Sequence, residues 1–82
     1  MAWSVYIAKC KDGSLYTGIA IDPVKRLRCH NNGTGSKYIR SKGAATLVYA
    51  ERLPNESSAR RRESEIQSWP RQKKLHLIAS RV

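Results

Sequence analysis

The chain has 82 residues, of which 16 are Lys or Arg and 6 are Asp or Glu, so its formal net charge is +10. This length predicts one domain over residues 1–82 and excludes a doubly wound nucleotide-binding fold. The charge predicts a polyanionic partner, most commonly nucleic acid, and the alternative is a charge that serves solubility alone.

The sequence shows no targeting signal and no cysteine motif. No apolar run approaches the ~20 residues of a membrane span, and the start of the sequence lacks the layout of a signal peptide. Cys10 and Cys29 form no CxxC pair, and neither His30 nor His76 completes a zinc pattern. We therefore expect a cytoplasmic protein, nucleoid-associated if bacterial, with reduced thiols, no membrane partner and no small-molecule cofactor.

Two strands and a hairpin are predicted first. Residues 3–10 and residues 15–20 each alternate between bulky apolar side chains and small or polar ones. The Asp12-Gly13 pair between them is typical of a hairpin turn.

The register of this hairpin decides which side chains share a face. A two-residue loop would put Tyr6 and Tyr16 on opposite faces. A three-residue loop over 11–13, with Gly13 in the left-handed region and a bulge, pairs Tyr6 with Gly18 and puts both tyrosines on one face. We prefer this register, because it separates a bulky apolar face from a face of small residues and two tyrosines.

A helix is predicted next, over about 23–32. Asp22 is expected to cap its start and Gly33 to end it. Val24 and Leu27 are expected to face the core.

The second half of the chain predicts a short helix at 37–42, a strand at 46–51, a helix at about 55–68 and a final helix at about 70–80. The strand is needed physically, because a lone hairpin is marginally stable. The predicted class is α+β: a small three-stranded antiparallel sheet flanked by helices, in the order β-β-α-α-β-α-α.

One carboxylate lies where an apolar side chain is expected. Ala59, Glu63 and Ile66 fall on one stripe of the 55–68 helix, and a carboxylate on an inward stripe is costly unless something compensates it. Either Glu63 pairs with Arg60 or Arg62, or it binds a divalent metal. Magnesium suits the second alternative, because it takes one or two carboxylates and keeps several waters.

Four short motifs, in order over about residues 3–78, carry a family resemblance. They are Val5-Tyr6, Tyr16-Thr17-Gly18, Lys25-Arg26-Leu27 with His30, and Ala59 through Glu63. With these motifs the chain resembles the GIY-YIG endonuclease superfamily, and within it the small standalone members. Related domains occur in a bacterial excision-repair nuclease and in a eukaryotic structure-specific nuclease. Ser4 and Thr17 depart mildly from the motifs.

The resemblance implies one-metal hydrolysis of a phosphodiester. Glu63 would hold Mg²⁺ or Mn²⁺, and Arg26 would bind a phosphate oxygen and stabilise the transition state. Tyr6 or Tyr16 would position the water or take its proton, and nearby positive charge would have to lower the tyrosine pKa. His30 would contact phosphate or assist proton transfer, or it would simply hydrogen-bond a tyrosine or solvent.

The partner implied is DNA. Backbone contacts are expected from Lys25, Lys37, Arg40 and Lys42, and Gly18 would leave space for a phosphate near the sheet. The arginines at 60–62 are expected to form a solvated face.

The expected function is metal-dependent DNA cleavage, structure-directed or nonspecific, in repair or recombination, with a protein partner as a source of specificity. Two rivals stay open. One is a nucleic-acid-binding module of the same fold with little turnover, and the other is a basic scaffold for an acidic protein.

Overall fold

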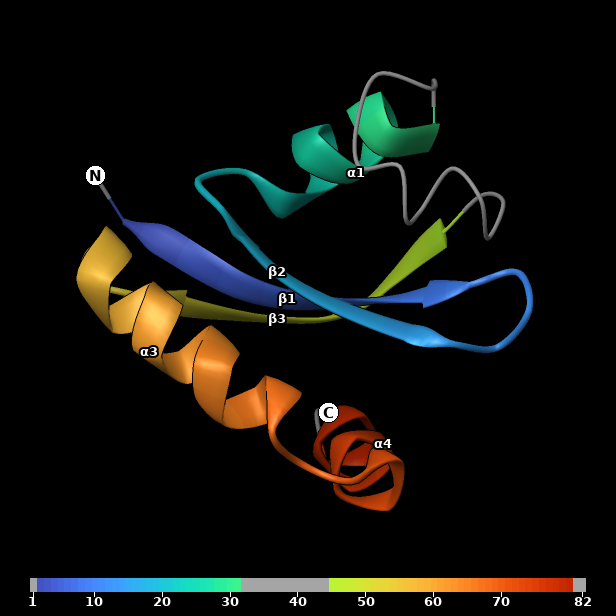
Figure 1. Cartoon of the computed structure of the whole chain (residues 1–82). Coiled ribbons are helices and arrows are strands. Elements are labelled where there is room, and N and C mark those ends of the chain that lie inside the picture. The colour runs from blue at the N-terminus through green and yellow to red at the C-terminus, as the bar shows by residue number, and fades with distance from the viewer. Residues whose placement is uncertain (1, 32–44, 81–82) are drawn as a thin grey trace.

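The computed structural model describes residues 2–31 and 45–80 (Figure 1). The elements are β1 (Trp3–Cys10), β2 (Leu15–Ala20), α1 (Pro23–Asn31), β3 (Ala45–Leu53), α3 (Glu56–Gln67) and α4 (Arg71–Ala79). The predicted α+β class and the order of these elements are confirmed, and β3 is longer than predicted. The short helix predicted at 37–42 lies outside the described residues.

The three strands form one antiparallel sheet in the order β2-β1-β3. In the hairpin Tyr6 pairs with Gly18, and the Cys10 amide donates to the Ser14 carbonyl at 2.8 Å. Gly13 has φ 91°, a region that glycine adopts without a steric penalty. The bulged three-residue turn is therefore the register that the protein uses.

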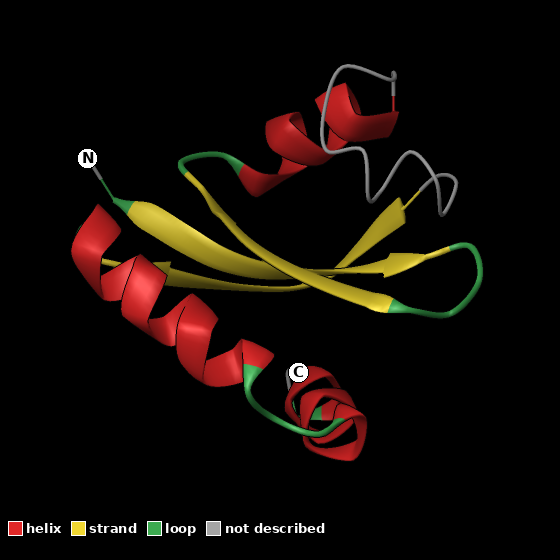
Figure 2. Ribbon diagram, in the orientation of Figure 1, coloured by secondary structure: helices red, strands yellow, loops and turns green. Residues whose placement is uncertain are grey.

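The sheet lies between helices. Helix α1 packs on one face, and α3 and α4 lie on the other (Figures 1 and 2). Buried side chains form two clusters, one on each side. The cluster on the α1 side holds Tyr6, Ala8, Cys10, Ala20, Leu27 and Ala45, and the cluster on the other side holds Val5, Ile7, Tyr49, Ala59 and Ile66. The face of the sheet that carries Tyr6 thus contributes to a second small core, as well as carrying residues of the predicted site.

Helix α1 begins as predicted but presents a different face. The Lys25 amide donates to Asp22 Oδ1 at 3.2 Å, which caps the helix. Leu27 is buried against the sheet, whereas Val24 is exposed. The prediction that Val24 faces the core was wrong, because the first turn of α1 adjoins the corner after β2 and no described element covers it.

A side chain joins the end of α1 to the start of β3. Asn31 Nδ2 donates to the Ala45 carbonyl at 3.0 Å, and Asn31 Oδ1 accepts from the Ala45 amide at 2.9 Å. This pair of bonds satisfies both polar groups of a buried backbone residue.

Helices α3 and α4 are separated by a short break. Asn55 caps α3, since its Oδ1 accepts from the Ser58 amide at 2.8 Å. Trp69 follows α3 and packs against the second cluster, and its ring also contacts Lys73 Nζ at 4.3 Å. None of the described helices is long and apolar enough to cross a lipid bilayer.

Candidate functional site

A cavity of about 710 Å³ opens between the sheet, the first turns of α1 and the middle of α3. Four of its lining residues are Tyr6 from β1, Tyr16 from β2, Arg26 from α1 and Glu63 from α3. These are four of the five residues for which a catalytic role is predicted. The fold therefore brings together side chains that lie up to 57 positions apart in the sequence.

The two tyrosines pack over Gly18. Their ring centroids are 6.2 Å apart and the ring planes meet at 44°. A Cβ placed on Gly18 would lie 2.8 Å from Tyr6 Oη and 3.1 Å from Tyr16 Cε1. An added side chain at position 18 would therefore collide with the tyrosine rings, while Gly18 itself lines the cavity.

The phenol of Tyr6 is a weaker acid than an ordinary tyrosine. Only 1% of its surface is exposed, and this burial, with a smaller repulsion from Tyr16, raises the pKa of Tyr6 to about 12. The neighbouring Arg26 guanidinium acts to lower that pKa, and Glu63 acts to raise it. The positive charge near Tyr6 is thus outweighed by burial, so this phenol stays protonated near neutral pH.

Glu63 has no partner among the described residues: none of the hydrogen bonds and ion pairs within 2–31 and 45–80 includes it. Its neighbours on the helix stripe, Ala59 and Ile66, are buried. The alternative in which Glu63 pairs with an arginine of its own helix does not occur. Arg60 donates to Glu56 at 2.7 Å instead, and Arg62 is engaged elsewhere.

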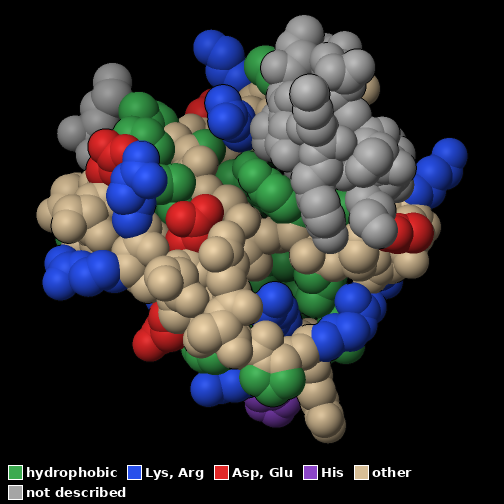
Figure 3. Space-filling model, in the orientation of Figure 1, with side chains coloured by type: hydrophobic (Ala, Val, Ile, Leu, Met, Phe, Trp, Pro, Cys, Tyr) green, Lys and Arg blue, Asp and Glu red, His purple; other side chains and the backbone are tan. Residues whose placement is uncertain are grey.

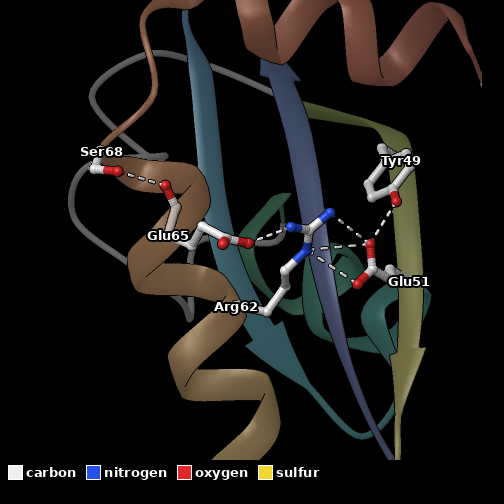
Figure 4. Close-up of polar contacts among 5 residues, drawn as sticks. All are labelled: Tyr49, Glu51, Arg62, Glu65 and Ser68. Atoms are coloured by element: carbon white, nitrogen blue, oxygen red, sulfur yellow. Dashed lines mark hydrogen bonds and ion pairs between the residues drawn. The ribbon is translucent and has the colours of Figure 1, made fainter.

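Arg62 lies between α3 and the sheet (Figure 4). Its Nε donates to Glu51 Oε2 at 3.1 Å, and its Nη1 donates to Glu65. Tyr49 Oη donates to Glu51 as well, at 2.6 Å, and the guanidinium lies 5.2 Å from the Trp69 ring centroid. The prediction of a solvated face was therefore wrong for Arg62, whose side chain is partly buried and paired.

This network has a consequence for the cavity. Glu51, Glu56 and Glu65 each hold an arginine. The other acidic residue that lines the cavity, Asp22, caps α1. Among the described residues, Glu63 is thus the carboxylate of the cavity that makes no hydrogen bond or ion pair.

The donor set suits a hard divalent cation. Within residues 2–31 and 45–80 no three His, Cys, Asp or Glu side chains gather at one point, so a metal held wholly by protein ligands is not built there. One carboxylate in an open cavity fits Mg²⁺ or Mn²⁺, which bind oxygen and keep most of their waters.

Of the remaining predicted residues, the structure describes the side chain of one. Lys25 is exposed and lines the cavity. His30 lies in α1, but its side chain is not among those described. The three other cations for which DNA contacts are predicted, Lys37, Arg40 and Lys42, lie outside the described residues.

Sequence reasoning missed Arg60 and Cys29, which also line the cavity. Arg60 precedes Glu63 by three positions in α3, and Cys29 follows Arg26 by three positions in α1. Residues three apart on a helix share a face, so this spacing was the signal available in the sequence.

Positive charge on the face shown in Figure 3 does not form one dense patch. Lys and Arg side chains are spread over that face in several groups, and Asp and Glu side chains are fewer (Figure 3). Such a distribution favours general attraction to a polyanion.

Comparison with known proteins gives one family. Residues 2–76 match the GIY-YIG family, which is described as the GIY-YIG catalytic domain. A UPF0213 protein of Staphylococcus saprophyticus is 53% identical over 75 residues, which cover 92% of each chain. A UPF0213 protein of Staphylococcus aureus is 51% identical over 77 residues, which cover 94% of each chain.

Two solution NMR structures have a similar fold. The UPF0213 protein of Bacillus halodurans superposes with a TM-score of 0.64 at 40% identity, over 99% of this chain and 86% of that one. A protein of E. faecalis superposes with a TM-score of 0.61 at 31% identity, over 94% of this chain and 83% of that one.

Proposed function

Since the chain belongs to the GIY-YIG family of catalytic domains, we propose that it is a metal-dependent endonuclease that hydrolyses DNA phosphodiester bonds. Family membership itself indicates a nuclease, that is, a phosphodiester hydrolase. The divalent metal, the DNA substrate and a structure-directed or nonspecific role in repair or recombination are our proposals, as is a protein partner that supplies specificity.

The observation that carries the proposal is the convergence of Tyr6, Tyr16, Arg26 and Glu63 on one cavity. Phosphodiester hydrolysis needs an activated water, a group that binds the phosphate and a means to neutralise charge on the leaving oxygen. A protein that only binds nucleic acid gains nothing from Glu63, because a lone carboxylate repels phosphate.

Each of two charged residues has a defined task in this proposal. Arg26 binds a non-bridging phosphate oxygen through its planar guanidinium and stabilises the charge that develops in the transition state. Glu63 holds the divalent cation, which when bound neutralises the phosphate and stabilises the leaving oxygen.

The tyrosines have different tasks. Because its pKa is raised to about 12, Tyr6 stays protonated and acts as a hydrogen-bond donor that orients the phosphate or the water. Tyr16 is only partly buried and lines the same cavity, so it is the tyrosine left to position or deprotonate the attacking water.

A plasmid-nicking assay tests the role of Glu63. Purified protein is incubated with supercoiled plasmid in Mg²⁺, in Mn²⁺ or in chelator, and Glu63→Gln is compared with Glu65→Gln. Glu65 lies on the same helix but is exposed and does not line the cavity. We expect Glu63→Gln to slow nicking by roughly 100-fold or more and Glu65→Gln to leave it nearly unchanged. Equal nicking by the Glu63 variant, or nicking in chelator, contradicts the proposal.

A second comparison separates cleavage from binding. Arg26→Ala is compared with Arg28→Ala, which removes an exposed cation two positions along α1 that does not line the cavity. We expect the first substitution to abolish nicking while salt-dependent DNA binding is largely retained. Wild-type protein that binds DNA and never nicks it favours the binding-module alternative.

A further inference from the structure

Two large apolar side chains are exposed at the corner between β2 and α1. Ile21 is 50% exposed and Val24 is 54% exposed. In the described part of the chain one other large hydrophobic side chain is this accessible, Leu75 in α4, at 40%. We call Ile21 and Val24 the apolar corner.

The apolar corner adjoins the candidate site. Ile21 lines the cavity together with Arg26, and Val24 directly precedes Lys25. The carboxylate inside this corner, Asp22, accepts a hydrogen bond from the start of α1. The surface around the corner therefore combines apolar groups with the cations of the first turns of α1.

That combination matches a single nucleotide. A phosphate requires a cation, and the flat face of a base is covered favourably by apolar side chains, as in proteins that insert Ile or Leu against a base step. In a fully paired duplex the base faces are already covered by stacking. An unstacked base next to the bound phosphate leaves one face open.

We propose that the apolar corner is a base-contacting site, where Ile21 and Val24 pack against the unstacked base of a nucleotide whose phosphate binds at Arg26. This inference rests on the proposed function, because that function places the phosphate at Arg26. It makes the apolar corner a determinant of which DNA structures the protein prefers, namely those with an unpaired nucleotide at the cavity.

The charge pattern favours this occupant over a protein. Lys25, Arg26 and Arg28 follow the corner within four residues of Val24, and the chain carries a net +10. A partner that covers the corner must therefore be anionic close to an apolar surface. A nucleotide has that chemistry in every repeat of its chain.

Binding in chelator tests the proposal without any dependence on cleavage. The probes are a duplex with a short single-stranded flap that carries 2-aminopurine at its first unpaired position, and a matched full duplex. The double variant Ile21→Ser, Val24→Ser is compared with wild type and with Leu75→Ser, which removes an exposed apolar side chain from α4. Affinity is measured by fluorescence anisotropy, and contact with the base by 2-aminopurine emission.

We expect the double variant to bind the flap roughly four- to fifteenfold more weakly, as the loss of one or two buried methyl groups predicts, with duplex affinity unchanged. The change in 2-aminopurine emission seen with wild type should also disappear. Leu75→Ser should match wild type on both probes. A second variant, Ile21→Met with Val24→Ile, keeps the corner apolar and should keep the flap preference.

Three results overturn the proposal. They are wild-type affinity in the double variant, an equal loss on flap and duplex, and a loss of self-association or partner binding with no change on either probe. Failure of the proposed nuclease function is distinguished separately, because it shows as absence of metal-dependent nicking while these affinities are unaffected.

Discussion

Replacing Gly18 by alanine should disturb the tyrosine pair directly. The added Cβ would lie 2.8 Å from Tyr6 Oη, 2.9 Å from Tyr6 Cζ and 3.1 Å from Tyr16 Cε1. These atoms belong to rigid rings and not to a flexible chain end, so they cannot rotate away. The Tyr6 ring must move by about half an ångström in a close-packed interior.

The size of the effect follows from where Tyr6 lies. The ring belongs to the same buried cluster as Leu27 of α1, so its displacement also disturbs that cluster. Overpacking by one methyl group costs typically about 1–3 kcal/mol. For a domain of this size that loss corresponds to a fall in Tm of roughly 5–20 °C.

Thermal unfolding and nicking together measure the effect. Gly13→Ala is the control, because its Cβ would meet no atom within 4 Å and the substitution is costly only through its φ of +91°. We expect Gly18→Ala to lower the Tm and, well below that Tm, to reduce nicking, whereas Gly13→Ala lowers the Tm alone. The double variant Gly18→Ala, Tyr6→Phe should recover part of the stability, because the closest atom is removed. A Gly18→Ala protein with wild-type Tm and wild-type nicking would refute the close packing of the tyrosines over Gly18.

Three other predictions concern acidity and stability. Spectrophotometric titration should show one phenol with a pKa of about 12 that is absent from Tyr6→Phe. Since the folded-state pKa lies above the unfolded value of 10.0, the stability linked to Tyr6 is full below about pH 10 and declines as the pH rises towards 12. Wild type should therefore lose more stability over this pH range than Tyr6→Phe. Arg62→Met should lower the free energy of unfolding by about 1–3 kcal/mol in urea titrations, because it leaves the Glu51 carboxylate without its cation. The control Arg61→Met, at an exposed position, should lower it by less than about 0.5 kcal/mol. Equal values for the two variants would contradict the role assigned to Arg62. Asn31→Ala should cost about 1–2 kcal/mol, since it removes two hydrogen bonds to the first residue of β3, and unchanged hydrogen exchange at the start of β3 would contradict this.

The hairpin and its register could be predicted because their determinants are local. The Asp-Gly turn fixes where the chain reverses, and one of the two possible registers sorts the side chains into a bulky face and a small one. That choice alone places Tyr6 and Tyr16 on the same face. The stripe of Ala59, Glu63 and Ile66 was equally accessible, because helical spacing sets it.

Other features depend on contacts that the sequence does not specify. Arg62 pairs with Glu51 on a different element, so its partner is decided by how α3 packs on the sheet. Val24 is exposed even though its spacing from Leu27 suggested that it faces the core. The high pKa of Tyr6 arises mainly from burial of the phenol, and local positive charge near the phenol suggested the opposite direction.

The strand order also determines when the sheet and the cavity can assemble during translation. β1 is the first strand in the chain but lies in the middle of the sheet, with β2 beside it and β3 joining its other edge much later. A nascent chain that ends after the hairpin has only a marginally stable pair of strands. Glu63 arrives later still, on α3. The cavity therefore assembles late in translation, and a polypeptide interrupted within β3 lacks the carboxylate to which we assign the metal.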